Sequence, residues 1–449
     1  MSTQKPYLSE DGNTLWLPYA LPDLLSAIER TEQAPAPEPP PGYTLSPGDD
    51  PAVALADLSA GDTLWLADAT FHRPIHLHKS INVRGLPGSS PMLSGWTLLR
   101  WDVAERRADS TVWVTPYNRF NGRLTHRIVT NSAFLAAQDG PARLAAHNAA
   151  TRPELVAYDR QPLRNATGRA DLTTGSCWYD EKDSNLYACL PAGSDLDLLE
   201  VAQYPQLFTA ADGVAGITVE GFTITGAANT HKQGAFELHS DGNTISNVTV
   251  QMVNSLGYSL RGIGLNINDA YALDCGQMGH WLKIQKSTIS IIHERSNWRG
   301  SDAGWHASNK FEQSIDNDIA IYARQAYGVG CWFDVGNHRN RVSVVSDGCH
   351  KNALMVEHYA DDNTFLLDIS GTRPIGRWEG ADIQIQSNVK GNTFTGDISG
   401  NAVPYWLVYK TAEGRGPSGP NTFTGISASG RPHRIEGGRH EKDIFEDIT

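Results

Sequence analysis

The C-terminal half of the chain repeats one short pattern, seen most clearly in NTFLLDISG (residues 363–371), NTFTGDISG (392–400) and NTFTGISASG (421–430). Each unit opens with Asn, alternates apolar and polar residues, and ends near a Gly. This pattern is typical of a short strand followed by a turn. Related units precede these three: ITVEGFTITGA (217–227), NTISNVTVQMV (243–253), STISIIHERS (287–296), NDIAIYARQA (317–326) and NRVSVVSDGC (340–349).

A second apolar strand follows each unit, and its first residue gives the period of the repeat. These first residues are Gly279, Gly304, Gly330 and Ala353, with separations of 25, 26 and 23 residues. A regular period without intervening helices predicts an all-β solenoid, a right-handed parallel β-helix with three short strands per coil of about 24 residues. A β-propeller would need antiparallel strands and a longer period. We interpret the recurrent Asn and Gly as turn residues that tolerate positive φ.

The repeat is interrupted, which predicts the domain organisation. Residues 50–98 and 204–449 form the predicted β-helix, and residues 99–203 are a β-rich, sandwich-like insertion. Within the insertion, WYDEKDSNLYACLP (178–191) indicates a hairpin. Residues 1–49 are an N-terminal extension with a helix over 21–32 and a stiff Pro-rich linker over 34–42. A second helix is expected over 50–58, capped by Asp50.

Composition excludes several classes of function. The net charge of −13 and the pI near 5.6 argue against nucleic acid as a partner, which requires a basic surface. No run of apolar residues is long enough for a membrane span, and no signal peptide is visible, so we expect a cytoplasmic protein without membrane contact. The five cysteines, an odd number without CxxC spacing, are expected to be free thiols.

Stacked coils place residues one period apart about 4.8 Å from one another. Counting four residues from each second-strand start gives a column of Lys283, Ser308, Asp334 and Glu357. Asp334 and Glu357 lie one coil apart, each after three bulky apolar residues. Two stacked carboxylates repel, and this separates their pKa values as acid and nucleophile roles require. Their expected spacing is close to that in retaining glycosidases, about 5–5.5 Å.

Aromatic and polar residues near this pair are candidate sugar-binding groups. Trp298, Trp305, Trp332, Trp378 and Trp406 fall in successive coils. Trp332 alternates with Phe333, so one of the two should face inward and the other outward. The predicted substrate-binding residues are Trp305, His306, Lys310, Trp332, Lys283 and Trp378.

The lysines also allow a different chemistry. β-Helix polysaccharide lyases use a Lys or Arg base and neutralise a uronate with Ca²⁺ or another cation. Asp361, Asp362 and Asn363 could supply calcium ligands, although their position at the opening of a strand also fits turn chemistry.

GVGCWFDVGN (328–337), followed one coil later by ALMVEHYADDNT (353–364), resembles the right-handed parallel β-helix glycosidases of the pectate-lyase-like superfamily, and most closely the retaining β-xylosidases. The resemblance covers roughly residues 51–400, except that the usual Gly of the Glu strand is Ala353. It implies that Asp334 is the nucleophile and Glu357 the acid/base. It also implies a carbohydrate or sugar-like substrate and no cofactor or metal.

The residues leave other functions open. The alternatives to a retaining glycoside hydrolase are a polysaccharide lyase or epimerase with a Lys base, a β-helix enzyme recruited as a biosynthetic isomerase or cyclase, and a non-catalytic carbohydrate-binding solenoid.

Overall fold

The computed structural model describes residues 7–8, 15–16, 43–117, 152, 154–230, 233–297, 307–374, 380–400, 402–411, 416–428, 434–435 and 443–448. Several predictions lie outside these residues. They are the helix over 21–32, the linker over 34–42, and the roles of Trp298, Trp305, His306 and Trp378.

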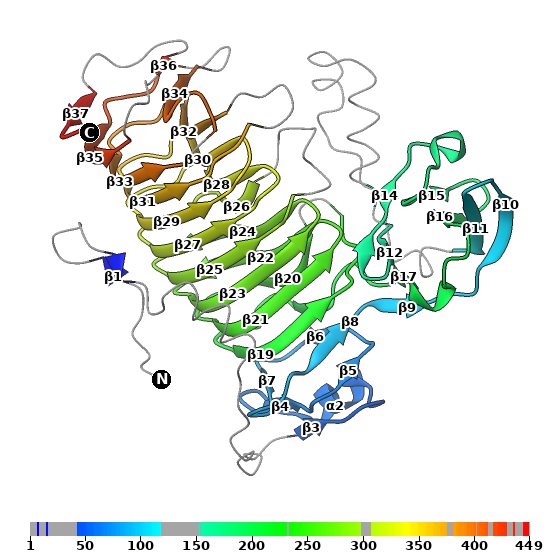
Figure 1. Cartoon of the computed structure of the whole chain (residues 1–449). Helices are drawn as coiled ribbons and strands as arrows, with labels where there is room; N and C mark the ends of the chain where they lie inside the picture. Colours follow the sequence, from blue (N-terminus) through cyan, green and yellow to red (C-terminus); the bar gives the residue numbers. More distant parts are fainter. Residues whose placement is uncertain are drawn as a thin grey trace.

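Two long parallel sheets form the body of the protein, and successive strands along the chain alternate between them (Figure 1). Each coil pairs in parallel with the next, so the structure is the predicted parallel β-helix and not a β-propeller. A third side of the coil carries isolated parallel bridges, which join Gln285, Ile315, His338 and Asp361.

Sheet A is the sheet that carries Asp334 and Glu357 at its strand ends. Its strands are β6 (Ile75–Leu77), β18 (Phe208–Ala210), β20 (Gly234–His239), β22 (Leu256–Ile263), β24 (Met278–Gln285), β26 (Ala307–Phe311), β28 (Val329–Phe333), β30 (Asn352–Glu357), β32 (Ala381–Gln386), β34 (Leu407–Lys410) and β36 (Arg434–Ile435).

Sheet B forms the other long side. Its strands are β3 (Tyr43–Leu45), β4 (Thr63–Leu66), β5 (Thr70–Phe71), β7 (Asn82–Gly85), β8 (Met92–Ser94), β19 (Thr218–Thr225), β21 (Thr244–Val253), β23 (Asn266–Cys275), β25 (Thr288–Glu294), β27 (Asp318–Arg324), β29 (Arg341–Asp347), β31 (Thr364–Ser370), β33 (Thr393–Ser399), β35 (Thr422–Ser427) and β37 (Ile444–Glu446).

The recurrent asparagines form a buried ladder inside the coils. The side-chain Nδ2 of Asn317, Asn340, Asn363 and Asn392 each donates to Oδ1 of the next asparagine, at 2.7, 2.8, 2.9 and 3.1 Å; the last acceptor is Asn421. Positive φ belongs instead to the residue before each of the four donor asparagines, such as Asp316 or Arg339. The turn interpretation of Asn was therefore wrong, because the amide recurs to satisfy buried polar groups across coils.

The inward-facing aromatic side chains of the repeat also stack from one coil to the next. The rings of Phe365, Phe394, Phe423 and Phe445 follow one another at centroid distances of 5.0, 4.9 and 4.9 Å. Phe311 and Phe333 stack at 4.6 Å in an earlier part of the core. One hydrophobic cluster runs from Leu45 to Ala428 along the axis of the coils. Each coil therefore depends on its neighbours for burial, as expected of a solenoid.

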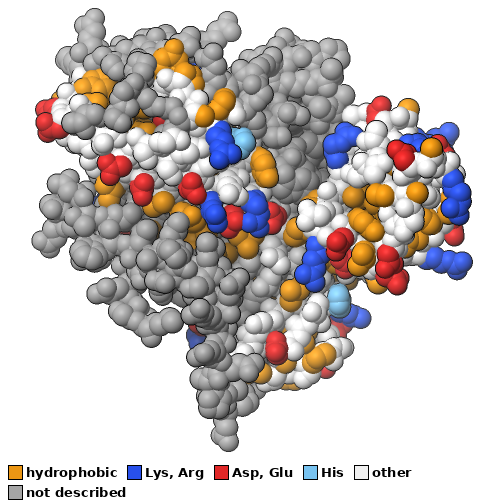
Figure 2. All heavy atoms as spheres, viewed as in Figure 1, with side chains coloured by type: hydrophobic (Ala, Val, Ile, Leu, Met, Phe, Trp, Pro, Cys, Tyr) orange, Lys and Arg blue, Asp and Glu red, His pale blue; other side chains and the backbone are white. Residues whose placement is uncertain are grey.

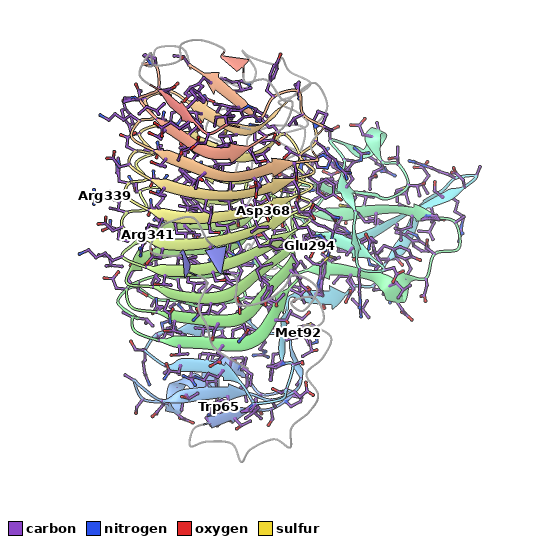
Figure 3. The ribbon with its side chains drawn as sticks, turned by 60° about the vertical axis from the view of Figure 1, so that its left-hand side comes forward. Trp65, Met92, Glu294, Arg339, Arg341 and Asp368 are labelled. Carbon is purple, nitrogen blue, oxygen red and sulfur yellow. The ribbon has the colours of Figure 1, made fainter. Side chains whose placement is uncertain are left out.

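Several charged side chains on the outer surface form ion pairs with one another. Arg339 and Arg341 lie at the left-hand corner of the coils in Figure 3, where Arg339 Nε is 2.7 Å from Asp316 Oδ1 and Arg341 Nε is 2.6 Å from Asp318 Oδ1. On the face shown in Figure 2, acidic and basic side chains likewise lie beside one another over the β-helix. Exposed pairs of this kind contribute little stability, about 0–1 kcal/mol each.

Residues between the first coils and the main solenoid form two further sheets that project to the right in Figure 1. The five-stranded sheet has the order β10-β11-β16-β15-β14, and the four-stranded sheet has the order β13-β12-β17-β9. The predicted hairpin is present as β15 and β16, which pair antiparallel. The bounds are β9 (Trp96–Leu98), β10 (Asp102–Arg106), β11 (Ser110–Pro116), β12 (Val156–Tyr158), β13 (Gln161–Pro162), β14 (Arg164–Asn165), β15 (Ser176–Asp180), β16 (Asn185–Pro191) and β17 (Leu199–Ala202).

Helical structure is short wherever the chain is described. Helix α2 (Pro51–Asp57) is the helix expected over 50–58, and the Asp50 side chain accepts from the backbone N–H of Ala52. Two 3₁₀ turns, η1 (Arg169–Asp171) and η2 (Leu196–Leu198), belong to the inserted sheets. None of the described helices has the length and hydropathy needed to cross a membrane. At the N-terminus, β1 (Tyr7–Leu8) and β2 (Leu15–Trp16) pair antiparallel.

All five cysteines lie within the described residues, and each is a buried thiol that forms no disulfide bond, as predicted.

Candidate active site

Asp334 and Glu357 lie side by side at the carboxyl ends of β28 and β30. Phe333 pairs with Val356, and these two side chains point into the core. By strand alternation, the next residue of each strand points outward. One carboxylate oxygen from each residue and Nδ1 of His358 all lie within 4.8 Å of one another. The two predicted carboxylates therefore form a close pair, and both are buried, at 7% and 4% exposure.

The column next to this pair differs from the predicted one. Strand β26 aligns Asn309 with His280 and with Cys331, so Ser308, not Gly304, lies at the second-strand start. Counting four residues from Ser308 gives Glu312, and the outward column is Lys283, Glu312, Asp334 and Glu357. Ser308 itself is fully buried. The count failed because the spacing is uneven: 29 residues separate Gly279 from Ser308, and 22 separate Ser308 from Gly330.

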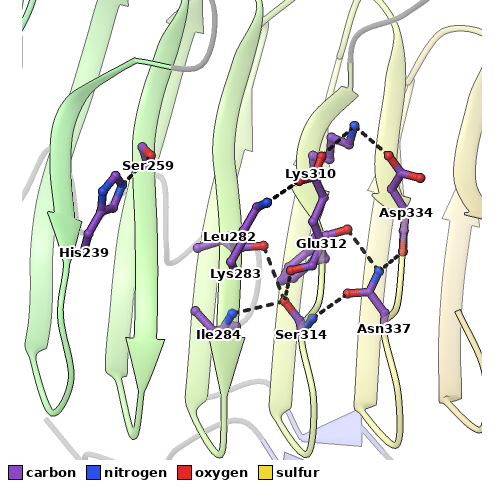
Figure 4. A network of polar contacts seen from close by, with 11 residues as sticks. His239, Ser259, Leu282, Lys283, Ile284, Lys310, Glu312, Ser314, Asp334 and Asn337 are labelled. Atoms are coloured by element: carbon purple, nitrogen blue, oxygen red, sulfur yellow. Dashed lines mark hydrogen bonds and ion pairs between the residues drawn. The ribbon is translucent and has the colours of Figure 1, made fainter.

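Lys310 links two carboxylates of the site (Figure 4). Its Nζ lies 2.8 Å from Asp334 Oδ2 and 3.0 Å from Glu312 Oε1. The other oxygen of Glu312 lies 2.9 Å from Nζ of Lys283. Lys283, Glu312, Lys310 and Asp334 thus form an alternating chain of charges, in which Asp334 is the last acidic group.

The ring of Trp332 packs against Lys310 in this chain of charges. Lys310 Nζ lies 4.0 Å from the centroid of its ring, a cation–π contact, and the Trp332 residue is only 7% exposed. Phe333 faces inward and Trp332 outward, as the alternation predicted. However, a ring face occupied by Lys310 is not the open sugar platform that the sequence suggested. Trp406 is also buried, against Phe423 and Phe445.

His358 is a site residue that the sequence interpretation missed, although it directly follows Glu357. Its Nδ1 lies 2.8 Å from Asp334 Oδ1 and 3.2 Å from Glu357 Oε1. Because both neighbours are carboxyl oxygens, we assign the proton to Nδ1, which donates to Asp334. The backbone of His358 has φ of +55°, an uncommon value for a non-glycine residue. This conformation turns the imidazole back toward the carboxylates.

The two carboxyl groups have pKa values displaced in opposite directions. Burial alone would raise the pKa of Asp334, but the hydrogen bond from His358 and the charge of Lys310 outweigh it and hold the pKa well below its usual range. Burial, followed by the negative charge of Asp334, raises the pKa of Glu357 to about 8. Near neutral pH, Asp334 is therefore a carboxylate and Glu357 a carboxylic acid.

The two carboxyl groups and the imidazole of His358 can also be considered as ligands of a metal ion. Asp334, Glu357 and His358 have the spacing of a three-ligand set, but the ammonium group of Lys310 already contacts Asp334. Two of the three calcium ligands considered from the sequence have other partners, since Asp361 Oδ1 accepts from the Lys390 N–H and Asn363 belongs to the asparagine ladder, whereas Asp362 is exposed. These contacts favour a site that uses Lys310 as its cation.

Comparison with known proteins adds information on the fold. A scan of protein-family models finds no match, and a search of curated protein sequences finds none either. Among solved structures, XylC in complex with xylose is similar with a TM-score of 0.55 and 11% identity, over 88% of this chain and 82% of that chain. A glycoside hydrolase is similar with a TM-score of 0.51 and 11% identity, over 86% of this chain and 89% of that chain. At this identity the similarity concerns the fold, and the chain shares the parallel β-helix architecture of these two proteins.

Proposed function

We propose that the chain is a retaining glycoside hydrolase in which Asp334 is the nucleophile and Glu357 the acid/base. The observation that carries this proposal is the close carboxyl pair with oppositely displaced pKa values. Its spacing fits the retaining geometry of about 5–5.5 Å better than the inverting geometry of about 6.5–9.5 Å, which leaves room for a water molecule. A β-xyloside is the first substrate to test, since the sequence resembles β-xylosidases and the fold is that of a protein solved with xylose.

In the first step, the Asp334 carboxylate forms a bond to the anomeric carbon while the bond from that carbon to the glycosidic oxygen breaks. The oxygen takes the bonding electron pair and a proton from Glu357, so the leaving group departs neutral. In the second step, the Glu357 carboxylate removes a proton from water, and the resulting hydroxyl displaces Asp334. Two inversions restore the original anomeric configuration.

Lys310 and His358 prepare Asp334 for this role. The charge of Lys310 and the N–H donors of both residues keep Asp334 ionised beside a second carboxyl group, so that Glu357 alone retains a proton. Glu312 in turn holds Lys310 in place.

The lyase alternative needs a neutral lysine as base. Burial alone would lower the pKa of Lys310, but the charges of Asp334 and Glu312 outweigh it and raise the pKa above its usual value. A lysine held as an ammonium ion between two carboxylates cannot accept a proton. This contact set favours hydrolysis over elimination.

The experiment that tests the proposal follows the product by NMR. We expect hydrolysis of an aryl β-xyloside to release β-xylose first, with the α-anomer appearing only by mutarotation. Initial release of α-xylose would contradict the retaining mechanism. An unsaturated product that absorbs in the ultraviolet, formed from a uronate-containing chain, would instead support the lyase.

The pH dependence follows from the two pKa displacements. Activity requires ionised Asp334 and protonated Glu357, so kcat/KM should stay constant through mildly acidic pH and fall as Glu357 loses its proton at about pH 8. The apparent values belong to the coupled pair. A pH–rate profile on an aryl glycoside measures both limbs, and a basic limb near pH 5 would argue against the assignment of Glu357 as the acid.

Replacing Lys310 should move the acidic limb. In Lys310→Met, Asp334 loses its closest positive charge, so its pKa rises and the acidic limb shifts upward by about one to three pH units. Lys283→Met is the matched control, because Lys283 contacts Glu312 rather than Asp334. Complete loss of product formation in Lys310→Met at every pH, with an unsaturated product in the wild type, would identify Lys310 as a lyase base.

A further inference from the structure

The outer face of sheet A carries basic residues on one side of the carboxyl pair. His239 pairs with Arg261, and Arg261 pairs with Lys283. Lys283 in turn precedes Glu312, Asp334 and Glu357 in the same outward column. A substrate chain that lies along this column and contacts the carboxyl pair would therefore extend over basic residues in the direction of β22.

Arg261 differs from the other cations of this face in having no acidic partner. Lys283 and Lys310 are held by Glu312 and Asp334, whereas Arg261 forms no ion pair with a described residue and is exposed. Its guanidinium carbon lies 5.0 Å from the centroid of the Trp281 ring. The contact supports the guanidinium from one side, while its N–H donors are available to a ligand.

One acidic neighbour of Arg261 is Glu237, and the two form no ion pair. Burial raises the pKa of Glu237, although the nearby charge of Arg261 lowers it, and one oxygen of Glu237 accepts from the Gly234 N–H at 3.2 Å. Burial also lowers the pKa of His239 to about 4, so that His239 is neutral near pH 7; its Nε2 contacts Ser259 Oγ at 2.9 Å (Figure 4). Among the described residues of this part of the face, Arg261 is therefore an exposed charge that forms no ion pair.

The position of Arg261 in the outward column indicates which part of a bound oligosaccharide could reach it. In the proposed mechanism the leaving group lies on the side of the acid/base, Glu357, which is one coil beyond Asp334. A glycone that extends from the anomeric carbon in the opposite direction along the column would lie over Lys283 and Arg261. Three coil steps of about 4.8 Å place Arg261 roughly 14 Å along the column from Asp334. A single pyranose ring does not span this distance, but an oligosaccharide does.

We propose that Arg261 binds the carboxylate of a uronic acid unit on the glycone side of an oligosaccharide substrate. This inference rests on the proposed glycosidase function. A planar guanidinium with several donors matches a carboxylate through two parallel hydrogen bonds. A sulfate ester offers the same anionic chemistry, and the test below distinguishes the two.

The test uses aryl trisaccharide glycosides that differ only in the unit at the non-reducing end, which is glucuronic acid, glucose or glucose 6-sulfate. We expect the wild type to prefer the glucuronic acid substrate. Arg261→Gln should lose about tenfold or more in kcat/KM on that substrate, mostly through KM, because a hydrogen-bonded charge is lost. Activity on the glucose analogue and on an aryl monoglycoside should not change.

Two controls keep the result specific. Arg339→Gln removes an exposed arginine at a distant corner of the coils (Figure 3) and should alter none of these rates. Arg261→Lys keeps the charge without the planar fork and should recover part of the preference. Thermal unfolding checks that Arg261→Gln leaves the fold intact.

Equal losses of Arg261→Gln on the acidic and neutral substrates, or a wild type without preference, would overturn the proposal. A preference for the sulfate ester would overturn the assignment to a carboxylate. If no glycoside is hydrolysed, the proposed glycosidase function fails separately, and calorimetric binding of the same trisaccharides still tests Arg261. Tighter binding of the uronate form that Arg261→Gln abolishes supports the site, and equal binding overturns it.

Discussion

Asp334→Asn should lower kcat for aryl glycoside hydrolysis by a factor on the order of 10⁴, because the amide cannot form the glycosyl-enzyme. Glu357→Gln should lower it by about 10²–10⁴ on substrates whose leaving group needs a proton. With an activated aryl leaving group, the first step survives in Glu357→Gln and the second becomes slow, because no base activates water. The covalent intermediate should then accumulate, which a burst of phenol release measures.

Azide separates the roles of the two carboxyl groups. It is an anionic nucleophile that needs no general base, so it should restore turnover of Glu357→Gln and yield a glycosyl azide of retained configuration. It should not restore Asp334→Asn, in which the intermediate never forms. The reverse pattern would exchange the two roles.

The matched control for this pair is Asp347→Asn on sheet B. Asp347 is an exposed carboxylate on the other long side of the coils, and its removal should leave kcat unchanged. Full activity of both site variants would contradict the paired-carboxyl mechanism. Absence of hydrolysis in the wild type, with conversion of another sugar-like substrate that both variants lose, would support the isomerase or cyclase alternative. Sugar binding without turnover, unaffected by either variant, would support the binding solenoid.

The second large effect concerns stability. Asn363→Ala should lower the free energy of unfolding by about 3–5 kcal/mol, because it removes a central amide of the buried ladder. Oδ1 of Asn363 accepts from both the backbone N–H and Nδ2 of Asn340, at 3.0 and 2.8 Å. Its Nδ2 donates to the Asn337 carbonyl and to Asn392 Oδ1. In the alanine variant these buried partners lose their hydrogen bonds.

Urea unfolding followed by circular dichroism measures the change. Asn268→Ala is the control, because Asn268 is half-buried on the outer side of β23 and should change stability by less than about 0.5 kcal/mol. A similar small change in Asn363→Ala would mean that the ladder relaxes around the gap, and the argued role of the recurrent Asn would then be wrong.

The repeat pattern was sufficient to predict the fold. Alternation in units such as NTFTGDISG assigns inward and outward residues, and repetition of the unit requires neighbouring coils to cover one another. Phe365, Phe394 and Phe423 recur at one position of the unit and stack in the core, as the pattern implies. The same reasoning placed Asp334 and Glu357 in one column, because the coil between them has no extra residues.

Other features depended on the register and packing of the folded chain. Spacing in sequence pointed to Ser308, whereas Glu312 occupies the column, because a loop can lengthen a coil without shifting its strands. The shared amides of Asn340 and Asn363 and the fold of His358 back onto Asp334 follow from contacts between coils. No periodicity encodes such contacts.

The sequence by itself determined the parallel β-helix and the stacking of Asp334 on Glu357, because strand alternation and coil period are local properties of the chain. The tertiary structure alone decided which carboxyl group keeps its proton, that Trp332 supports Lys310, and that Arg261 forms no ion pair with a described residue. The physical reason is that burial and the positions of charges are set jointly by three or more coils, whose loop lengths vary independently of their strands.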